Sequence, residues 1–311
     1  MENDLRNYMF SCLTFLPDFK SNPVCFAGTE HSLLVSKDGG ENWQDDLVSL
    51  GSTEPVAITS VLSVPQPAQP PLLIAGIVGG FLRSQDSGQT WQVISSGSPP
   101  PVITALAASG GGNLFAGSAD DGIFVSQDGG NKWVRWNFGL LDWHIFSIAV
   151  LPPTNDGTGG GQDVLLAGTE SGIFRSTNNG RAWSEVDFPD DVGAVLSLSV
   201  SSTSQQPVIY AGSETGALFC SQDGGFTWTH IASGIFKSEI SVLVASGNSV
   251  LAASHEQLMV SHDCGSTWKA WNTTEQVTGS ILSIAAPQGL DSGQPVLVGT
   301  NGNIYLVYEE S

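Results

Sequence analysis

The chain has 311 residues, with 30 Asp and Glu against 10 Lys and Arg and a formal net charge of −20 at pH 7. Nucleic acids and anionic membranes both require a basic protein surface, so this charge argues against both kinds of partner. The sequence contains no run of 18 apolar residues, and we expect no membrane insertion.

The N-terminal residues and the cysteine spacing indicate the cellular compartment in which the protein resides. Residues 1–4 (MEND) lack the positive and apolar stretches of a signal peptide. Cys12, Cys25, Cys220 and Cys264 lie far apart and form no Cys-x-x-Cys pair. This usage is typical of a reducing compartment and not of a disulfide framework. We therefore expect a cytoplasmic protein.

A pattern of the form Ser-x-Asp-x-Gly-x-x-Trp recurs six times along the chain. Successive tryptophans lie about 40 to 50 residues apart, a period that indicates a repeat architecture whose unit is one supersecondary element. The six copies, called the repeat turns below, are Ser36–Trp43, Ser84–Trp91, Ser126–Trp133, Ser176–Trp183, Ser221–Trp228 and Ser261–Trp268.

Each repeat turn follows a short apolar run and predicts a β-hairpin. The residue at its third position can accept hydrogen bonds from the backbone of the turn, and its glycines adopt positive φ without steric cost. The tryptophan opens the outgoing strand and buries apolar area against a neighbouring repeat. The third-position residues are therefore assigned a structural and not a catalytic role: Asp38, Asp86, Asp128, Asn178, Asp223 and Asp263.

Two further strands precede the apolar run before each repeat turn, and one strand follows the turn. Each repeat therefore holds four strands. The innermost strand is predicted seven times, at Met9–Phe15, Ile58–Val64, Val102–Ala107, Phe146–Leu151, Val195–Val200, Ile240–Ala245 and Ile281–Ala286. Seven repeats of about 44 residues predict an all-β fold, a single seven-bladed β-propeller domain of four-stranded antiparallel blades over residues 1–311.

The seventh repeat ends after its third strand, at residues 303–308, and has no repeat turn. The missing outer strand would leave an open edge, which natural sheets avoid. We expect Met1–Arg6 to supply that strand and to close the ring.

The repeat turns resemble the Asp-box, or bacterial neuraminidase repeat (BNR), of β-propellers. Such repeats occur in sialidases, xyloglucan-active endoglucanases, sortilin-type receptors and the photosystem II stability/assembly factor family. The resemblance to the assembly factors covers almost the whole chain in blade number and size, but the arginine-rich patch of that family is missing. The resemblance therefore implies a similar scaffold.

The arginine triad of sialidases does not carry over to this chain. Arg6, Arg83, Arg135, Arg175 and Arg181 are its five arginines, and none lies on an inner strand or a crossover, where a triad would converge. The endoglucanases use paired aspartates between two propellers. A pair of Asp142 with Asp120 or Glu170 is conceivable here, but no motif supports it. The five histidines form no metal-ligand spacing, so we expect no metal and no other cofactor.

Acidic residues recur in the connections between second and third strands. Placed around a channel mouth, they would form a partial carboxylate ring able to bind a cation or a basic peptide, although a glutamate is also a common hairpin residue in such repeats. The candidates are Glu30, Asp120, Asp121, Glu170, Glu214 and Glu256.

A second candidate is the aromatic crossover after the third repeat turn. Trp143 and His144 lie in the loop itself, and an exposed ring beside an imidazole can anchor a protein or a sugar. Packing between blades is the alternative role. Together these features favour a non-enzymatic scaffold that binds a protein or a basic peptide, with a glycan-active or glycan-binding propeller as the alternative.

Overall fold

The computed structural model describes residues 8–50, 54–96, 100–151, 162–189, 192–202, 207–255, 257–273 and 276–309. The chain divides into two compact units. Unit 1 comprises Met1–Ile103 and Asn272–Ser311, and unit 2 comprises Thr104–Trp271.

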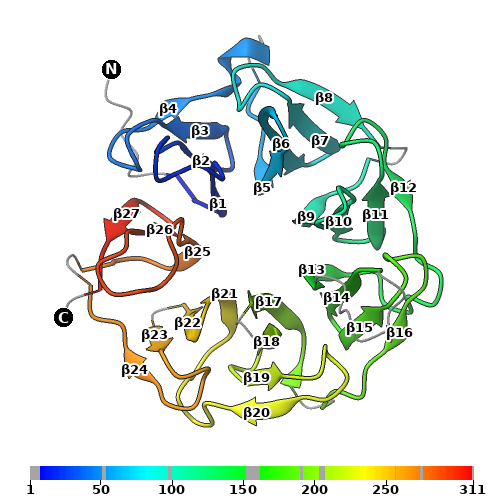
Figure 1. The fold of residues 1–311 in the computed structure, drawn as a ribbon, viewed down its shortest axis with the longest axis vertical. Helices are drawn as coiled ribbons and strands as arrows, with labels where there is room; N and C mark the ends of the chain where they lie inside the picture. The colour runs from blue at the N-terminus through cyan, green and yellow to red at the C-terminus, as the bar shows by residue number, and fades with distance from the viewer. Residues whose placement is uncertain are drawn as a thin grey trace. The chain divides into compact units, whose positions relative to one another are not determined.

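The chain is an all-β protein with the fold class of a seven-bladed β-propeller, and Figure 1 labels its strands. The antiparallel sheets, here called blades 1 to 7 in chain order, have four strands each except blade 7, which has three among the described residues. Blades 1, 2 and 7 lie in unit 1, and blades 3 to 6 lie in unit 2 apart from Ile103.

In unit 1, the strands are β1 (Cys12–Phe15), β2 (Cys25–Gly28), β3 (Leu33–Ser36), β4 (Gln44–Asp45), β5 (Ile58–Gln66), β6 (Gln69–Ile77), β7 (Gly80–Ser84), β8 (Gln92–Ser95), β25 (Ile281–Ala285), β26 (Val296–Thr300) and β27 (Ile304–Val307), with a 3-10 helix η2 (Leu47–Leu50). In unit 2, they are β9 (Ile103–Ala108), β10 (Leu114–Ser118), β11 (Ile123–Ser126), β12 (Val134–Arg135), β13 (Ile145–Leu151), β14 (Val164–Thr169), β15 (Gly172–Ser176), β16 (Ser184–Glu185), β17 (Val195–Ser202), β18 (Pro207–Ser213), β19 (Leu218–Ser221), β20 (Thr229–Ile231), β21 (Ile240–Ser246), β22 (Ser249–Ser254), β23 (Leu258–Ser261) and β24 (Lys269–Ala270).

Burial explains why the middle strands of a blade read as continuous apolar runs. Every residue of β2, β3, β10 and β11 is buried, because the two middle strands are covered on both faces. The fourth strands are short and exposed, as in β16 and β24. An exposed two-residue outer strand presents little unpaired edge to other chains.

Most inner strands contain a β-bulge after their first residue. The register shifts between Ile58 and Ser60 in blade 2 and between Ile145 and Ser147 in blade 4. In blade 1 the predicted strand began at Met9, whereas β1 begins at Cys12. The segment before β1 bonds to two blades: the amide of Ser11 donates to the carbonyl of Gly28 in blade 1 (3.0 Å), and the amide of Phe10 donates to a carbonyl of blade 7.

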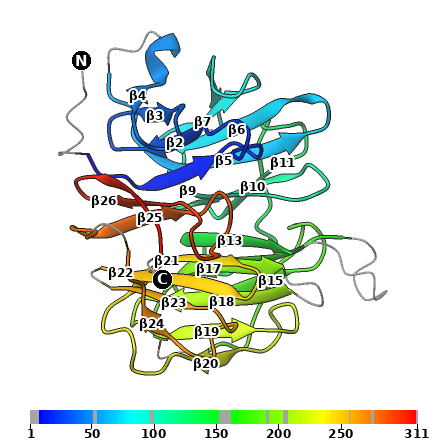
Figure 2. The same ribbon diagram turned by 60° about the vertical axis from the view of Figure 1, so that its left-hand side comes forward.

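That contact joins blades 1 and 7 within unit 1. The amide of Phe10 donates a hydrogen bond to the carbonyl of Thr300 (3.1 Å), and Ser283 Oγ donates to the carbonyl of Phe10 (2.6 Å). Phe10 shares a buried cluster with Leu297, and Figures 1 and 2 both show β25 and β26 alongside β1. The expected closing segment, Met1–Arg6, lies outside the described residues.

A glycine at the end of the second strand lets neighbouring blades approach. A Cβ on Gly117 would lie 2.5 Å from Ile145 Cγ2 at the start of the next inner strand, and a Cβ on Gly212 would lie 2.6 Å from Ile240 Cγ2. Neither glycine has a positive φ. The absence of a side chain, and not backbone freedom, is therefore what these positions require.

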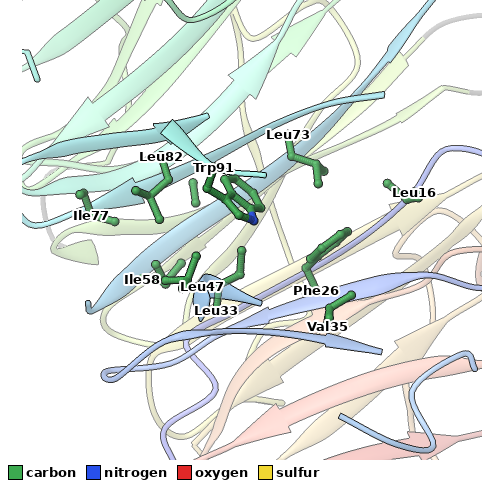
Figure 3. Packing of buried hydrophobic residues seen from close by; sticks show 11 residues of the cluster. Leu16, Phe26, Leu33, Val35, Leu47, Ile58, Leu73, Ile77, Leu82 and Trp91 are labelled. Carbon is green, nitrogen blue, oxygen red and sulfur yellow. The ribbon is translucent and has the colours of Figure 1, made fainter. Parts of the chain in front are cut away.

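Apolar side chains fill the space between adjacent blades. In unit 1, Phe26 and Leu33 of blade 1 pack with Leu73, Leu82 and Trp91 of blade 2, as Figure 3 shows. The indole of a repeat turn therefore buries its area against the preceding blade.

Hydrogen bonds inside the repeat turns agree with their structural assignment. In the third turn, Ser126 Oγ and the amide of Lys132 both donate to Asp128 Oδ1 (2.9 Å each), and the amide of Gly130 donates to Ser126 Oγ (2.9 Å). The Lys132 amide, followed by the other turn donors, lowers the pKa of Asp128. Asn178 accepts the corresponding bonds in the fourth turn.

Candidate binding surface

The crossover from β12 to β13 is held against the next blade by a carboxylate. Asp142 Oδ1 accepts the amide of His144 (3.0 Å), and Asp142 Oδ2 accepts the amide of Ser171 in the β14–β15 hairpin (2.8 Å). Burial raises the pKa of Asp142, but these N–H donors outweigh burial and lower the pKa overall. The loop geometry is thus fixed by an ionised side chain.

His144 lies among three carboxylates of unit 2. Its Nδ1 is 3.2 Å from Asp142 Oδ1 and 3.3 Å from Glu170 Oε2, and its Nε2 is 3.4 Å from Asp120 Oδ1. These residues come from the crossover, from the β14–β15 hairpin and from the β10–β11 hairpin. One imidazole carries at most one positive charge, so the cluster stays negative in either protonation state of His144.

Apolar side chains stand exposed on the same crossover. Phe138 is 79% exposed, Leu141 80% and Trp143 48%. Trp143 is anchored at its polar end, since its Nε1 donates to the carbonyl of Leu140 (3.1 Å), while Gly122 donates to the carbonyl of Trp143 (3.1 Å). A rigidly held aromatic ring beside exposed apolar side chains is typical of a surface that contacts a partner.

The remaining acidic candidates are arranged differently. Asp121 Oδ1 pairs with Arg135 Nη1 (2.7 Å) next to the cluster. Glu30, in unit 1, accepts the amide of Met9 through Oε2 (2.7 Å). Glu214 accepts the amide of Ala194 in the same manner (3.3 Å). The structure therefore brings Asp120, Glu170, Trp143 and His144 together. In contrast, Glu30 and Glu214 point toward backbone amides of their own blades.

Glu256 lies outside the described residues. Sequence reasoning did not select Phe138 or Leu141, although both belong to the aromatic crossover that it singled out. Their signal was available, because Phe138-Gly139-Leu140-Leu141 is a dense apolar run inside a predicted loop.

Two further properties of the described residues concern metal binding and membrane insertion. Over the described ranges, no group of three or more His, Cys, Asp and Glu side chains has the arrangement of a metal site. Within the same part of the chain, no helix is long and apolar enough to cross a membrane.

Among curated proteins, the chain is similar to two of different function. It is 30% identical to the xyloglucanase of Hypocrea jecorina (strain QM6a) over 207 residues, which is 66% of this chain and 23% of that protein. It is 25% identical to the photosystem II assembly lipoprotein Ycf48 of Synechococcus sp. (strain CC9902) over 235 residues, 68% of this chain and 59% of that protein. The chain thus spans about a quarter and three fifths of these relatives. No family model matches the chain.

Solved structures include the same two kinds of protein. The GH74 xyloglucanase from Xanthomonas campestris has a TM-score of 0.72 at 15% identity, over 98% of this chain and 52% of that one. YCF48 from Cyanidioschyzon merolae has a TM-score of 0.64 at 14% identity, over 98% and 96%. The chain is therefore a seven-bladed β-propeller similar to Ycf48 and to GH74 xyloglucanases.

Proposed function

We propose that the chain is a non-enzymatic scaffold of the Asp-box type that binds a basic protein or peptide on the crossover of blade 3. The acidic-aromatic surface consists of Asp120, Phe138, Leu141, Trp143, His144 and Glu170. The observation that supports this proposal is the cluster of three carboxylates around His144, next to three exposed apolar side chains on one loop.

Each part of the surface has a distinct task. The apolar rings supply contact area, since aromatic anchors dominate binding energy in protein interfaces. The carboxylates attract Lys and Arg side chains and raise the rate of encounter. A partner with both apolar and basic residues satisfies the whole surface. The similarity to Ycf48, described as an assembly protein, supports a protein partner over a small substrate.

A random peptide library displayed on phage tests this proposal without knowledge of the natural partner. The library is selected on the wild-type chain in low salt and, in parallel, on a Phe138→Ser, Leu141→Ser, Trp143→Ala variant. We expect the wild type to enrich peptides that combine Lys or Arg with large apolar residues. The variant should lose that enrichment.

Charge is examined with a second pair of variants. Asp120→Asn with Glu170→Gln removes two charges from the surface, and Glu185→Gln with Asp187→Asn removes two exposed charges elsewhere in unit 2. The first pair should reduce binding of the selected peptides, whereas the second should not. The proposal is contradicted if the two double variants bind the selected peptides equally well. It is also contradicted if the wild type enriches peptides that lack basic residues.

A glycan-active or glycan-binding function is the second candidate. It is favoured by the xyloglucanase similarity and by the approach of both Asp142 and Glu170 to His144 Nδ1. A glycosidase needs one carboxyl group with a raised pKa as general acid, and the pKa of Asp142 is lowered. Release of reducing sugar from xyloglucan, lost in Glu170→Gln, would establish this alternative.

A further inference from the structure

A hydroxyl group closes the hairpin at the end of the second strand in most blades. This Thr or Ser donates to a backbone carbonyl three or four residues ahead, at 2.8 to 3.1 Å, in Thr29, Ser118, Thr169 and Thr300. The bond satisfies a side chain that is otherwise fully buried.

The next residue often ties the hairpin to the start of its own blade. In blade 1, Glu30 accepts the backbone amide of Met9, and in blade 5, Glu214 accepts the backbone amide of Ala194. Each of these amides lies just before the inner strand of the same blade. In blade 7, Asn301 Oδ1 does the same with the amide of Ser280 (2.8 Å). A side-chain oxygen thus occupies the space between hairpin and crossover.

Blade 6 departs from this rule at both positions. His255 stands where blades 1 and 5 have Glu and blade 7 has Asn, and the amide that would be accepted belongs to Glu239. Ser254 is 0% exposed, and its Oγ has no hydrogen-bond partner in the described part of the chain. The Oε1 of Gln257 is also buried without a partner.

A pocket of about 550 Å³ occupies this place, a volume in the usual range for ligand sites. Its lining combines the crossover before β21 with the β22–β23 hairpin: Lys237, Ser238, Glu239, Ser254, His255 and Gln257. An exposed ammonium and a buried hydroxyl therefore face the same space, together with an amide oxygen.

We propose that this pocket binds a carboxylate with an adjacent amide N–H, the chemistry of a peptide C-terminus. The carboxylate takes the place of the side-chain oxygen missing from this hairpin. It accepts hydrogen bonds from Ser254 Oγ and from the backbone N–H of Glu239, and Lys237 supplies the opposite charge.

The amide N–H follows from the second unpartnered atom. Gln257 Oε1 is an acceptor and can be satisfied only by a donor, which a simple carboxylate lacks. The last peptide N–H of a polypeptide lies next to its terminal carboxylate and provides that donor. An N-acyl amino acid has the same two groups and is the small-molecule source of this chemistry.

The test uses an array of hexapeptides with free C-termini and randomised last three residues. The strongest binder is then measured by fluorescence anisotropy as a free acid and as its C-terminal amide. We expect the amide to bind at least about tenfold more weakly, because it lacks the charge that the pocket complements. Competition by the matching N-acetyl amino acid, at a concentration near the peptide Kd, would identify a small-molecule site.

Two variants assign the contacts. Ser254→Ala should weaken the free acid about tenfold while leaving the unfolding midpoint unchanged or higher, because it breaks no hydrogen bond within the protein. Ser118→Ala, which loses the bond to Gly122, should lower the midpoint. Lys237→Gln should weaken the free acid and flatten its salt dependence, whereas Lys132→Gln on a repeat turn should not.

Equal binding of acid and amide overturns the proposal, as does unchanged affinity in both Ser254→Ala and Lys237→Gln. Failure to find any free-acid ligand on the array overturns it as well. The pocket shares no residue with the acidic-aromatic surface, so each site stands or fails independently of the other.

Discussion

Replacement of Asp46 by Asn is expected to stabilise the protein at neutral pH. Asp46 follows β4 in blade 1, and its Oδ2 accepts the indole N–H of Trp91 in blade 2 (2.8 Å). Burial raises the pKa of Asp46 to about 6, although the bond from Trp91 and the charge of Lys37 act in the opposite direction. Asparagine keeps an acceptor for the indole and removes the charge.

The sign follows from proton linkage. The folded chain holds this proton more tightly than the unfolded chain, in which the pKa is near 3.8. The free energy of unfolding contributed by Asp46 therefore falls as pH rises from about 4 to about 6 and is constant above that. This pKa shift corresponds to a loss of unfolding free energy of at most about 3 kcal/mol. Since the carboxylate is partly exposed, solvent screening reduces this to about 1 kcal/mol.

Urea unfolding followed by tryptophan fluorescence measures the effect between pH 4 and 7.5. The difference between Asp46→Asn and wild type should be near zero at pH 4 and reach about 1 kcal/mol in favour of the variant at pH 7.5. Glu41→Gln, an exposed change in the same blade, should show no such rise. A difference independent of pH, or a variant less stable at pH 7.5, would refute the reasoning.

Two further substitutions test the packing and the turns by the same unfolding assay. Gly117→Ala places a Cβ against Ile145 and should lower the free energy of unfolding by about 1–3 kcal/mol. The control, Gly110→Ala, has open space around it and should change stability by less than about 0.5 kcal/mol. Equal effects of the two substitutions would show that the blades move apart to accommodate the extra Cβ. Asp128→Ala should cost about 1–2 kcal/mol through the lost bond to the Lys132 amide, and it should leave binding of the selected peptides intact; a stable variant that loses binding would place function on the turns.

The blade architecture was predictable because it depends on local rules repeated along the chain. A serine, an acceptor and glycines at fixed spacing determine each repeat turn, and apolar runs between turns determine the strands. The glycine after the Ala of the second strand in blades 1 to 5 was visible in the sequence as well. Its purpose, close contact with an isoleucine or valine at the start of the next inner strand, required coordinates.

The candidate site was only partly predictable, since a repeated sequence pattern does not determine the direction in which each side chain points. Glu30, Glu170 and Glu214 occupy equivalent hairpin positions, but Glu30 and Glu214 accept a backbone amide whereas Glu170 approaches His144. The difference arises because the crossover before β13 contributes its own acceptor, Asp142. Comparison of the repeats could have marked His255 as the one histidine at that position.

The association rate of a selected basic peptide, measured by stopped-flow fluorescence at several salt concentrations, tests the central proposal most directly. For the wild type, we predict a rate that falls steeply between about 50 and 500 mM salt, as the Debye length shrinks below about 10 Å. Asp120→Asn with Glu170→Gln should associate several-fold more slowly at low salt and respond little to salt. Identical rates for the two proteins across the whole range would contradict the proposal that these carboxylates recruit a basic partner.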